Sequence, residues 1–127
     1  MKAEISAGAL PRKRSEIEKL SQQYFHAFEN KDIQSLENLF SEDIILRDWE
    51  NEIYGKSQVI DFNEAVFSQS ETIRVQINKI YCSTDGAACD IIIQLCNSLT
   101  KLELFVVDIL TFNEQKKLCR IEAFRGN

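Results

Sequence analysis

An aspartate interrupts a long apolar run near the end of the chain. Residues 102–112 read Leu-Glu-Leu-Phe-Val-Val-Asp-Ile-Leu-Thr-Phe. In a strand, side chains alternate between two faces, so one face would carry Leu102, Leu104, Val106, Asp108, Leu110 and Phe112. Burying an ionised carboxylate without a partner is costly, and such a group tends to keep its proton. We therefore predict a raised pKa for Asp108 and a neutral carboxyl that donates a hydrogen bond, a useful catalytic group.

An ion pair is the alternative explanation for a buried Asp108. Arg120 and Arg125 lie in the next predicted strand, and either guanidinium would hold the carboxyl ionised. In the favoured strand register, Ile121 and Ala123 share the face of Asp108, so Arg120 points to the other side. The sequence leaves both explanations open.

Tyr24 and Asp48 are two further residues able to take part in proton transfer. Tyr24 falls on the apolar stripe of a predicted first helix, where a buried hydroxyl needs a hydrogen-bond partner. That partner is either a ligand or a backbone carbonyl of the core. Asp48 follows Ile44 and Leu46 on the inward face of a predicted short strand, with Arg47 on the opposite face. Asp48 is either a base in a pocket or a cap for the turn that follows.

Two helices are predicted before that strand. Ser15 and Glu18 have the spacing of a capping box, and the apolar residues after them recur at helical spacing over roughly four turns. Asp32 can cap a second helix that ends near Phe40. A single histidine, His26, lies two positions from Tyr24, so we expect it to be exposed and without a functional role.

A third helix is predicted after the strand. Residues 41–43 have the composition of a turn, and residues 49–55 that of a loop. Ser57 can then cap a helix that continues to about Ser68.

The second half of the chain predicts a sheet. Four runs of alternating character occupy residues 72–83, 88–97, 101–112 and 117–125. Turn residues separate the runs, most clearly Asp85-Gly86, which is typical of a hairpin. Helices followed by an antiparallel meander predict an α+β fold.

Side-chain matching predicts the register of these strands. A three-residue loop in the first hairpin pairs Ile77 with Leu95, and we prefer it to a strict two-residue loop because apolar residues then face each other. In the next two hairpins, the apolar faces match when Asp108 lies opposite Ile91 and Ile121. Isoleucines on both sides would raise the pKa of Asp108 by desolvation.

The composition predicts one ordinary globular domain. The chain has 127 residues, 44% hydrophobic and 28% charged, and we divide it into an N-terminal arm (1–14) and a single domain (15–127). A net charge of -5 argues against binding of nucleic acid or an anionic membrane surface, and we interpret the basic cluster 12–14 as a solvated tail. Without an apolar run for a membrane span or a signal peptide, we expect a cytoplasmic protein.

The four cysteines do not predict a metal site. None of them forms a Cys-x-x-Cys motif, and His26 is remote from them in the sequence. We interpret them as packing residues in a reducing compartment and expect no metal and no Cys82–Cys89 disulfide.

Several segments together resemble the nuclear transport factor 2-like superfamily, which includes the ketosteroid isomerases and the SnoaL-like cyclases. The resemblance covers about residues 15–126. It rests on Tyr-Phe-His-Ala-Phe-Glu-Asn-Lys-Asp (24–32), on Leu-Phe-Ser-Glu-Asp-Ile-Ile-Leu-Arg-Asp (39–48), on Gly55, and on residues 107–112 and 120–124.

The resemblance implies a fold and a mechanism. The fold is a curved antiparallel sheet wrapped around N-terminal helices to form a cone with one pocket. In ketosteroid isomerases a tyrosine of the first helix and an aspartate late in the sheet bind the oxyanion, and an aspartate ending the first strand is the base. Tyr24, Asp108 and Asp48 fall at these places. The resemblance thus implies an isomerase or cyclase that moves a proton next to a carbonyl and needs no cofactor.

The same resemblance implies a ligand and a partner. The ligand would be a small hydrophobic carbonyl compound, in a pocket lined by Phe28, Trp49, Phe62, Ile91, Val106, Leu110 and Ile121. The partner would be a second copy of the chain, bound through the outer sheet face, where Phe105, Val107 and Ile109 supply apolar surface.

Two other functions are compatible with the sequence. A non-catalytic binding or interaction domain of the same fold would have Asp48 capping a turn, away from the pocket. A dehydratase-like relative would need a histidine–aspartate pair in the pocket, and His26 is misplaced for that role.

Overall fold

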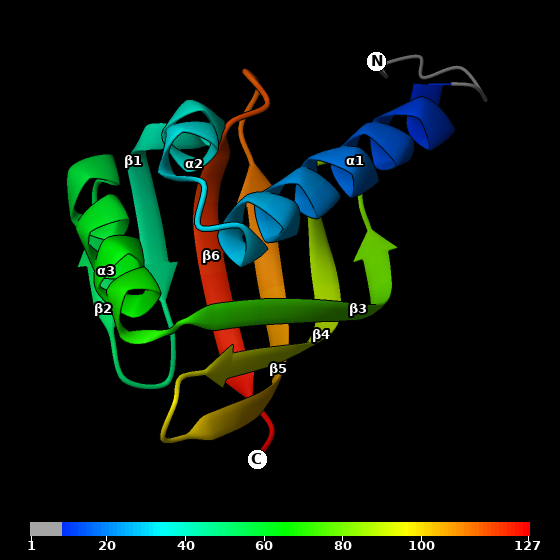
Figure 1. Ribbon diagram of the computed structural model, residues 1–127. Coiled ribbons are helices and arrows are strands. Elements are labelled where there is room, and N and C mark those ends of the chain that lie inside the picture. Colours follow the sequence, from blue (N-terminus) through cyan, green and yellow to red (C-terminus); the bar gives the residue numbers. More distant parts are fainter. Residues whose placement is uncertain (1–8) are drawn as a thin grey trace.

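In residues 9–127, which the computed structural model describes, three helices pack against the concave face of one curved six-stranded sheet (Figure 1). The elements in chain order are α1 (Ala9–Glu29), α2 (Ile33–Leu39), β1 (Phe40–Arg47), β2 (Glu52–Tyr54), α3 (Lys56–Gln69), β3 (Thr72–Cys82), β4 (Gly86–Cys96), β5 (Lys101–Phe112) and β6 (Leu118–Arg125). The predicted α+β fold with a curved sheet around N-terminal helices is confirmed, and the sheet is not closed into a barrel. None of the described helices has the length and apolar character needed to cross a bilayer.

The sheet has the strand order β2-β1-β6-β5-β4-β3. Strands β3 to β6 form the predicted antiparallel meander. Two features were not predicted. Strand β1 pairs in parallel with β6, and part of the expected 49–55 loop forms β2, which pairs with β1. The parallel pairing places the end of β1 next to β6, and β6 separates it from the middle of β5.

Helix α1 begins earlier than predicted. It starts at Ala9, so Ser15 lies inside the helix and cannot cap it. The residues before Ser15 include alanine, leucine and basic residues that favour helix, and a proline is tolerated in a first turn. Residues 9–14 therefore belong to α1 and not to an arm, and the rest of the predicted arm lies outside the described residues.

The links between the first elements are shorter than predicted. Asp32 caps α2 as expected, because its Oδ1 accepts a hydrogen bond of 3.1 Å from the Ser35 amide. The predicted turn at 41–43 is wrong. Phe40 ends α2 with an extended backbone and opens β1 directly, opposite Leu118. Helix α3 begins at Lys56, and Gly55 (φ 94°) takes the capping position predicted for Ser57.

The first hairpin has a longer turn than predicted. Ser83 organises it, since its hydroxyl accepts from the amides of Asp85 (3.3 Å) and Gly86 (3.1 Å). Ile77 therefore faces Ile91 and not Leu95, and a bulge interrupts the pairing between Ile77 and Lys79.

The strands around Asp108 are shifted by two residues from the predicted register. Asp108 pairs with Cys89 on β4 and Ala123 on β6, not with Ile91 and Ile121. A shift of two preserves the face on which each side chain lies, so the predicted inward face is retained. The neighbours of Asp108 are smaller than predicted, which leaves space beside its carboxyl.

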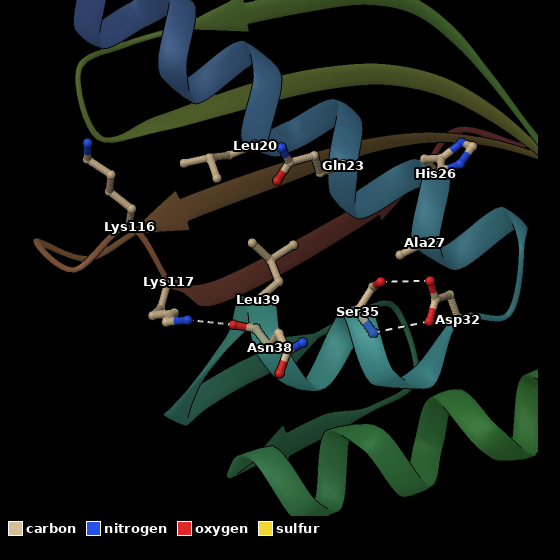
Figure 2. Close-up of a pocket in the computed structure, with 10 residues that line it drawn as sticks. All are labelled: Leu20, Gln23, His26, Ala27, Asp32, Ser35, Asn38, Leu39, Lys116 and Lys117. Carbon is tan, nitrogen blue, oxygen red and sulfur yellow. Dashed lines mark hydrogen bonds between the residues drawn. The ribbon is translucent and has the colours of Figure 1, made fainter.

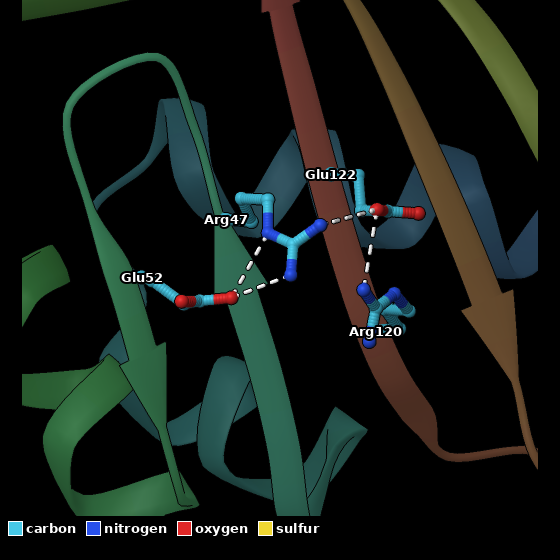
Figure 3. Close-up of polar contacts among 4 residues, drawn as sticks. All are labelled: Arg47, Glu52, Arg120 and Glu122. Carbon is cyan, nitrogen blue, oxygen red and sulfur yellow. Dashed lines mark hydrogen bonds and ion pairs between the residues drawn. The ribbon is translucent and has the colours of Figure 1, made fainter.

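Four charged side chains form a network on the outer face of β2, β1 and β6 (Figure 3). Arg47 Nη2 lies 2.5 Å and Nε 3.0 Å from Glu52 Oε2. Arg120 Nη2 lies 3.2 Å from Glu122 Oε2, which is also 3.7 Å from Arg47 Nη1. Arg47 thus lies on the face predicted for it, and Arg120 is directed away from Asp108 as predicted.

The first prediction concerns the close approach of β4 to β5 at Gly86. A Cβ atom added there would lie 2.4 Å from the Leu110 carbonyl oxygen. Gly86→Ala should lower the free energy of unfolding by about 1–3 kcal/mol, because the strands must move apart. Urea denaturation measures this loss. Gly126→Ala is the control, since its Cβ would meet Phe105 at an ordinary 3.5 Å. Equal stability of the two variants would contradict this prediction.

Candidate functional site

The concave face of the sheet contains a cavity of about 320 Å³, and Tyr24, Asp48 and Asp108 all line it. The three residues come from α1, from the residue after β1 and from β5. Helix α3 supplies a further wall with Phe62, and the sheet supplies the floor. The sequence-predicted residues are therefore brought together around one space.

Asp48 and Asp108 lie in one row across the sheet, on either side of Ala123. Arg47 pairs with Glu122, so Asp48 is level with Ala123, and Ala123 pairs with Asp108. With strands about 4.8 Å apart, the two aspartate Cα atoms are separated by about 10 Å. The small side chain of Ala123 leaves the space between the carboxyl groups open to a ligand.

Asp108 is a buried acid without a cationic partner among the described residues. Only 5% of its surface is exposed, and the nearest predicted candidate, Arg120, pairs with Glu122 on the outer face. Burial, and secondarily the charge of Asp48, raises the pKa of Asp108 from 3.8 to about 7. The predicted rise by desolvation is confirmed. Near neutral pH this carboxyl can therefore donate a proton or a hydrogen bond.

Tyr24 provides a second donor at the same place. Its ring packs in an aromatic cluster with Phe25, Phe28 and Phe40, at centroid distances of 5.1, 6.3 and 6.3 Å. Burial raises the pKa of Tyr24 well above 10, and the charge of Asp108 adds to that rise. The phenol therefore keeps its proton at neutral pH and can donate it in a hydrogen bond.

The two carboxylate oxygens of Asp48 have different hydrogen-bond environments. Its Oδ1 accepts hydrogen bonds from the Glu50 amide (2.8 Å), the Asn51 amide (2.7 Å) and Asn51 Nδ2 (3.1 Å). It thus caps the turn before β2, which was the alternative role considered for it. Its Oδ2 receives only a long contact of 3.3 Å from Asn51 Nδ2. This second oxygen retains lone pairs that can accept a proton.

The structure places five of the seven residues of the predicted pocket lining at the cavity. Phe28, Trp49, Phe62, Val106 and Ile121 line the cavity. Ile91 and Leu110 do not, because both are 0% exposed in the core. Ile91 pairs with the lining residue Val106, and Leu110 follows Asp108 on the inward face of β5, but neither contributes to the cavity wall.

The sequence did not identify several residues of the lining. These are Leu46, Glu50, Asn51, Asn63, Val66, Ile93, Leu95, Leu102, Leu104, Ala123 and Arg125. Asn63 carried a recognisable signal, because it is a polar residue within the buried face of α3. Its side chain is 1% exposed.

Aromatic and charged side chains surround the mouth of the cavity. Trp49 is 40% exposed, and the guanidinium of Arg125 lies 5.7 Å from the centroid of its ring. Glu50 also lines this region. The predicted alternative ion pair between Arg125 and Asp108 is replaced by this cation–π contact at the surface.

A second hollow of about 420 Å³ lies between α1, α2 and the β5–β6 turn (Figure 2). Two pairs of its polar groups bind each other: Asp32 accepts from Ser35 Oγ at 2.6 Å, and Lys117 Nζ donates to the Asn38 carbonyl at 2.6 Å. His26 is exposed in this hollow, as predicted, and does not line the cavity with Asp108. None of the three residues predicted to take part in proton transfer lines the hollow.

Within residues 9–127, no group of three His, Cys, Asp or Glu side chains is arranged to hold a metal ion. Apart from Glu50 and Arg125 at the mouth and Asn51, which binds Asp48, the polar side chains of the cavity that could act on a ligand are the Asp48 and Asp108 carboxyls, the Tyr24 phenol and the Asn63 amide. They are suited to proton transfer and hydrogen bonding.

Comparisons with known proteins identify a family and a fold for this chain. The family model described as the SnoaL-like domain matches residues 21–121, which is most of the chain. No curated protein sequence matches at a significant level.

Solved structures with the same fold are distant in sequence. The epoxide hydrolase/cyclase-like enzyme SalBIII, described in pyran ring formation in salinomycin, has a TM-score of 0.79 at 13% identity, covering 88% of this chain and 92% of its own. An epoxide hydrolase from M. tuberculosis described as LEH-like has a TM-score of 0.80 at 10% identity (90% and 85% covered). A proposed ketosteroid isomerase from Kribbella flavida has a TM-score of 0.74 at 16% identity (93% and 80% covered). At these identities the likeness establishes the fold alone.

The second prediction follows from the raised pKa of Asp108. The pKa of Asp108 in the folded protein, about 7, exceeds its ordinary value of 3.8, so the folded protein binds more protons than the unfolded chain between these pH values. The free energy of unfolding therefore falls as pH rises from about 4 to about 7. About three pKa units correspond to about 4 kcal/mol. Asp108→Asn, which resembles the neutral acid, should lose this component and be more stable than the wild type at pH 8.

Urea denaturation at pH 5 and pH 8 measures this difference. The exposed Asp90 on the same sheet provides the control, because Asp90→Asn should retain the wild-type pH dependence. Identical pH dependence in the wild type and Asp108→Asn would contradict the prediction.

Proposed function

The chain belongs to the SnoaL-like domain family, and from this premise we propose that its cavity transfers a proton next to the carbonyl of a small apolar ligand, as an isomerase or cyclase, without a cofactor. One observation carries the proposal: the buried Asp108 carboxyl, without a cation among the described residues, shares a cavity with Tyr24 and with a second carboxyl. A buried structural acid would need only its own partner, and this arrangement instead provides donors and a base around an open space.

In the proposed mechanism, the ligand carbonyl oxygen lies between the Tyr24 hydroxyl and the Asp108 carboxyl. Removing a proton from the adjacent carbon moves negative charge onto that oxygen. Two donors held in a buried site stabilise the charge more in the transition state than in the ground state. Burial raises the pKa of both donors, so that Tyr24 keeps its proton at neutral pH and Asp108 keeps its proton below a pH of about 7.

Asp48 is the base in this mechanism. It lies across Ala123 from Asp108, so a carbon next to the bound carbonyl falls between the two acids. The Oδ2 atom takes the proton and returns it to another carbon of the same conjugated system. The hydrogen bonds to Oδ1 fix the carboxylate in place during both steps.

The lining indicates the ligand class. Apart from the acids, the phenol, the amides and the groups at the mouth, the walls are aromatic and aliphatic. A volume of about 320 Å³ is near the lower end for ligand pockets, which favours a compact cyclic ketone over a large one.

A binding domain without catalysis is the second candidate function. The four hydrogen bonds that Asp48 accepts in the 48–51 turn favour this function, because they account for an aspartate at this position without a catalytic role. In that case the cavity would bind the same apolar ligands but would leave them unchanged.

The third prediction separates these two functions. With a set of β,γ-unsaturated cyclic ketones from one ring to a 3-ketosteroid, the wild type should form the conjugated ketone, which ultraviolet absorbance detects. Asp48→Asn should lower the rate by about 10²–10⁴-fold, the range for loss of a general base. Asp61→Asn, on the exposed side of α3, should retain the rate. Ligand binding without conversion in the wild type would support the binding domain instead.

We further propose a homodimer formed through the outer face of the sheet. Phe105 and Val107 are exposed there and Ile109 is partly buried, between the inward residues of β5. Phe105→Lys should therefore shift sedimentation equilibrium from dimer to monomer, since it places a charge in the apolar face. Leu99→Lys, at a residue 91% exposed between β4 and β5, is the control. A monomeric wild type would contradict this prediction.

A further inference from the structure

A buried amide in the cavity wall has a donor that no described part of the chain satisfies. Asn63 lies on α3, is 1% exposed, and its Nδ2 atom forms no hydrogen bond with the described residues. The same side chain lines the cavity beside Phe62 and Val66. Buried polar atoms are rarely left unpaired, and each exception needs an explanation.

Packing does not explain an asparagine at this position. The other buried residues of α3 are Val59, Ile60 and Phe67, so a leucine would suit the surroundings of residue 63. An unpaired buried donor destabilises a fold, whereas an apolar residue of similar shape does not. A partner from outside the chain accounts for the amide, and the cavity is the space from which that partner can reach it.

The position of Asn63 relative to Tyr24 follows from one aromatic contact. The rings of Phe28 on α1 and Phe67 on α3 meet edge to face at a centroid distance of 5.2 Å. Tyr24 and Asn63 each lie four residues before that contact on their own helices. Four residues span about 6 Å of helix, or one turn. The phenol and the amide thus enter the same cavity from two different walls.

We propose that Asn63 donates a hydrogen bond to a second oxygen of the ligand, other than the carbonyl oxygen held by Tyr24 and Asp108. This inference rests on the proposed function and narrows the substrate class of the proposed reaction. The substrate is then a cyclic ketone that carries a further carbonyl, hydroxyl or ether oxygen elsewhere on its ring system. A plain hydrocarbon at that position would leave the amide unpaired.

The test uses two ligands that differ only in this oxygen. One is a product-like bicyclic conjugated enone with a second carbonyl on the far ring, and the other is the same enone without it. Neither is converted, so binding is measured without turnover. Quenching of Trp49, the single tryptophan of the chain and a cavity residue, reports the dissociation constants.

The wild type should bind the two-carbonyl enone about 3–10-fold more tightly, the effect of one neutral hydrogen bond. Asn63→Leu should reduce this ratio to about one. The matched control is Phe62→Leu, which changes the neighbouring wall without removing a polar group. It should weaken both ligands and retain the ratio.

The melting temperature of the ligand-free protein gives an independent readout. Asn63→Leu should raise it by about 3 °C or more, because the variant removes an unpaired buried amide. A lower melting temperature would mean that the amide is already satisfied within the fold, and it would overturn the proposal.

A ratio near one in the wild type, or a ratio retained in Asn63→Leu, would also overturn the proposal, as would the absence of binding of both enones. These results are separate from the Asp48→Asn assay. A wild type that discriminates between the enones but converts no β,γ-unsaturated ketone would support Asn63 as a ligand contact and contradict the proton-transfer function.

Discussion

The burial of Asp108 without a cationic partner in residues 9–127 is the constraint on which the rest of the site depends. A carboxyl in this environment is tolerated because it can hold its proton, and an arginine within reach would remove that property. The sheet satisfies this condition by directing Arg120 to the outer face, where it pairs with Glu122, which also pairs with Arg47 (Figure 3). Because side chains alternate between the two faces of β6, Arg120 joins the outer charge network. The same alternation leaves the inner acid, Asp108, without that arginine and therefore neutral.

Strand topology, and not sequence proximity, assembles the site. Tyr24, Asp48 and Asp108 are far apart in the chain. The parallel pairing of β1 with β6, whose other neighbour is β5 (Figure 1), brings Asp48 to within one strand of Asp108. Ala123 separates the two carboxyls by one strand. This separation is wide enough for a ligand atom between them and narrow enough for the charge of Asp48 to raise the pKa of Asp108.

The sequence predicted the faces of the strands better than their neighbours. Alternation has a period of two, so Asp108 was placed inward correctly even though its register was wrong by two residues. The register of Asp108 depends on the turns at 97–100 and 113–117, where the Asn97 and Asn113 side chains accept hydrogen bonds from backbone amides, and on the shift in the β5–β6 pairing after Thr111. No hydrophobic pattern encodes these features. The pairing of β1 with β6 is a long-range contact, which hydrophobic alternation does not predict. The role proposed for Asn63 depends on the cavity beside it, which is visible only in the structure.

The bulge in β3 also affects how readily the molecule could aggregate through the edge of its sheet. Strand β3 ends the sheet, and a long open edge is a template for uncontrolled pairing between molecules. Here the bulge after Ile77 breaks the regular ladder, and Glu29 Oε2 accepts from the Val75 amide at 2.9 Å, occupying one edge donor. These features act against fibrillar growth along this border of the sheet, so the protein can carry a wide apolar surface at lower risk of aggregation.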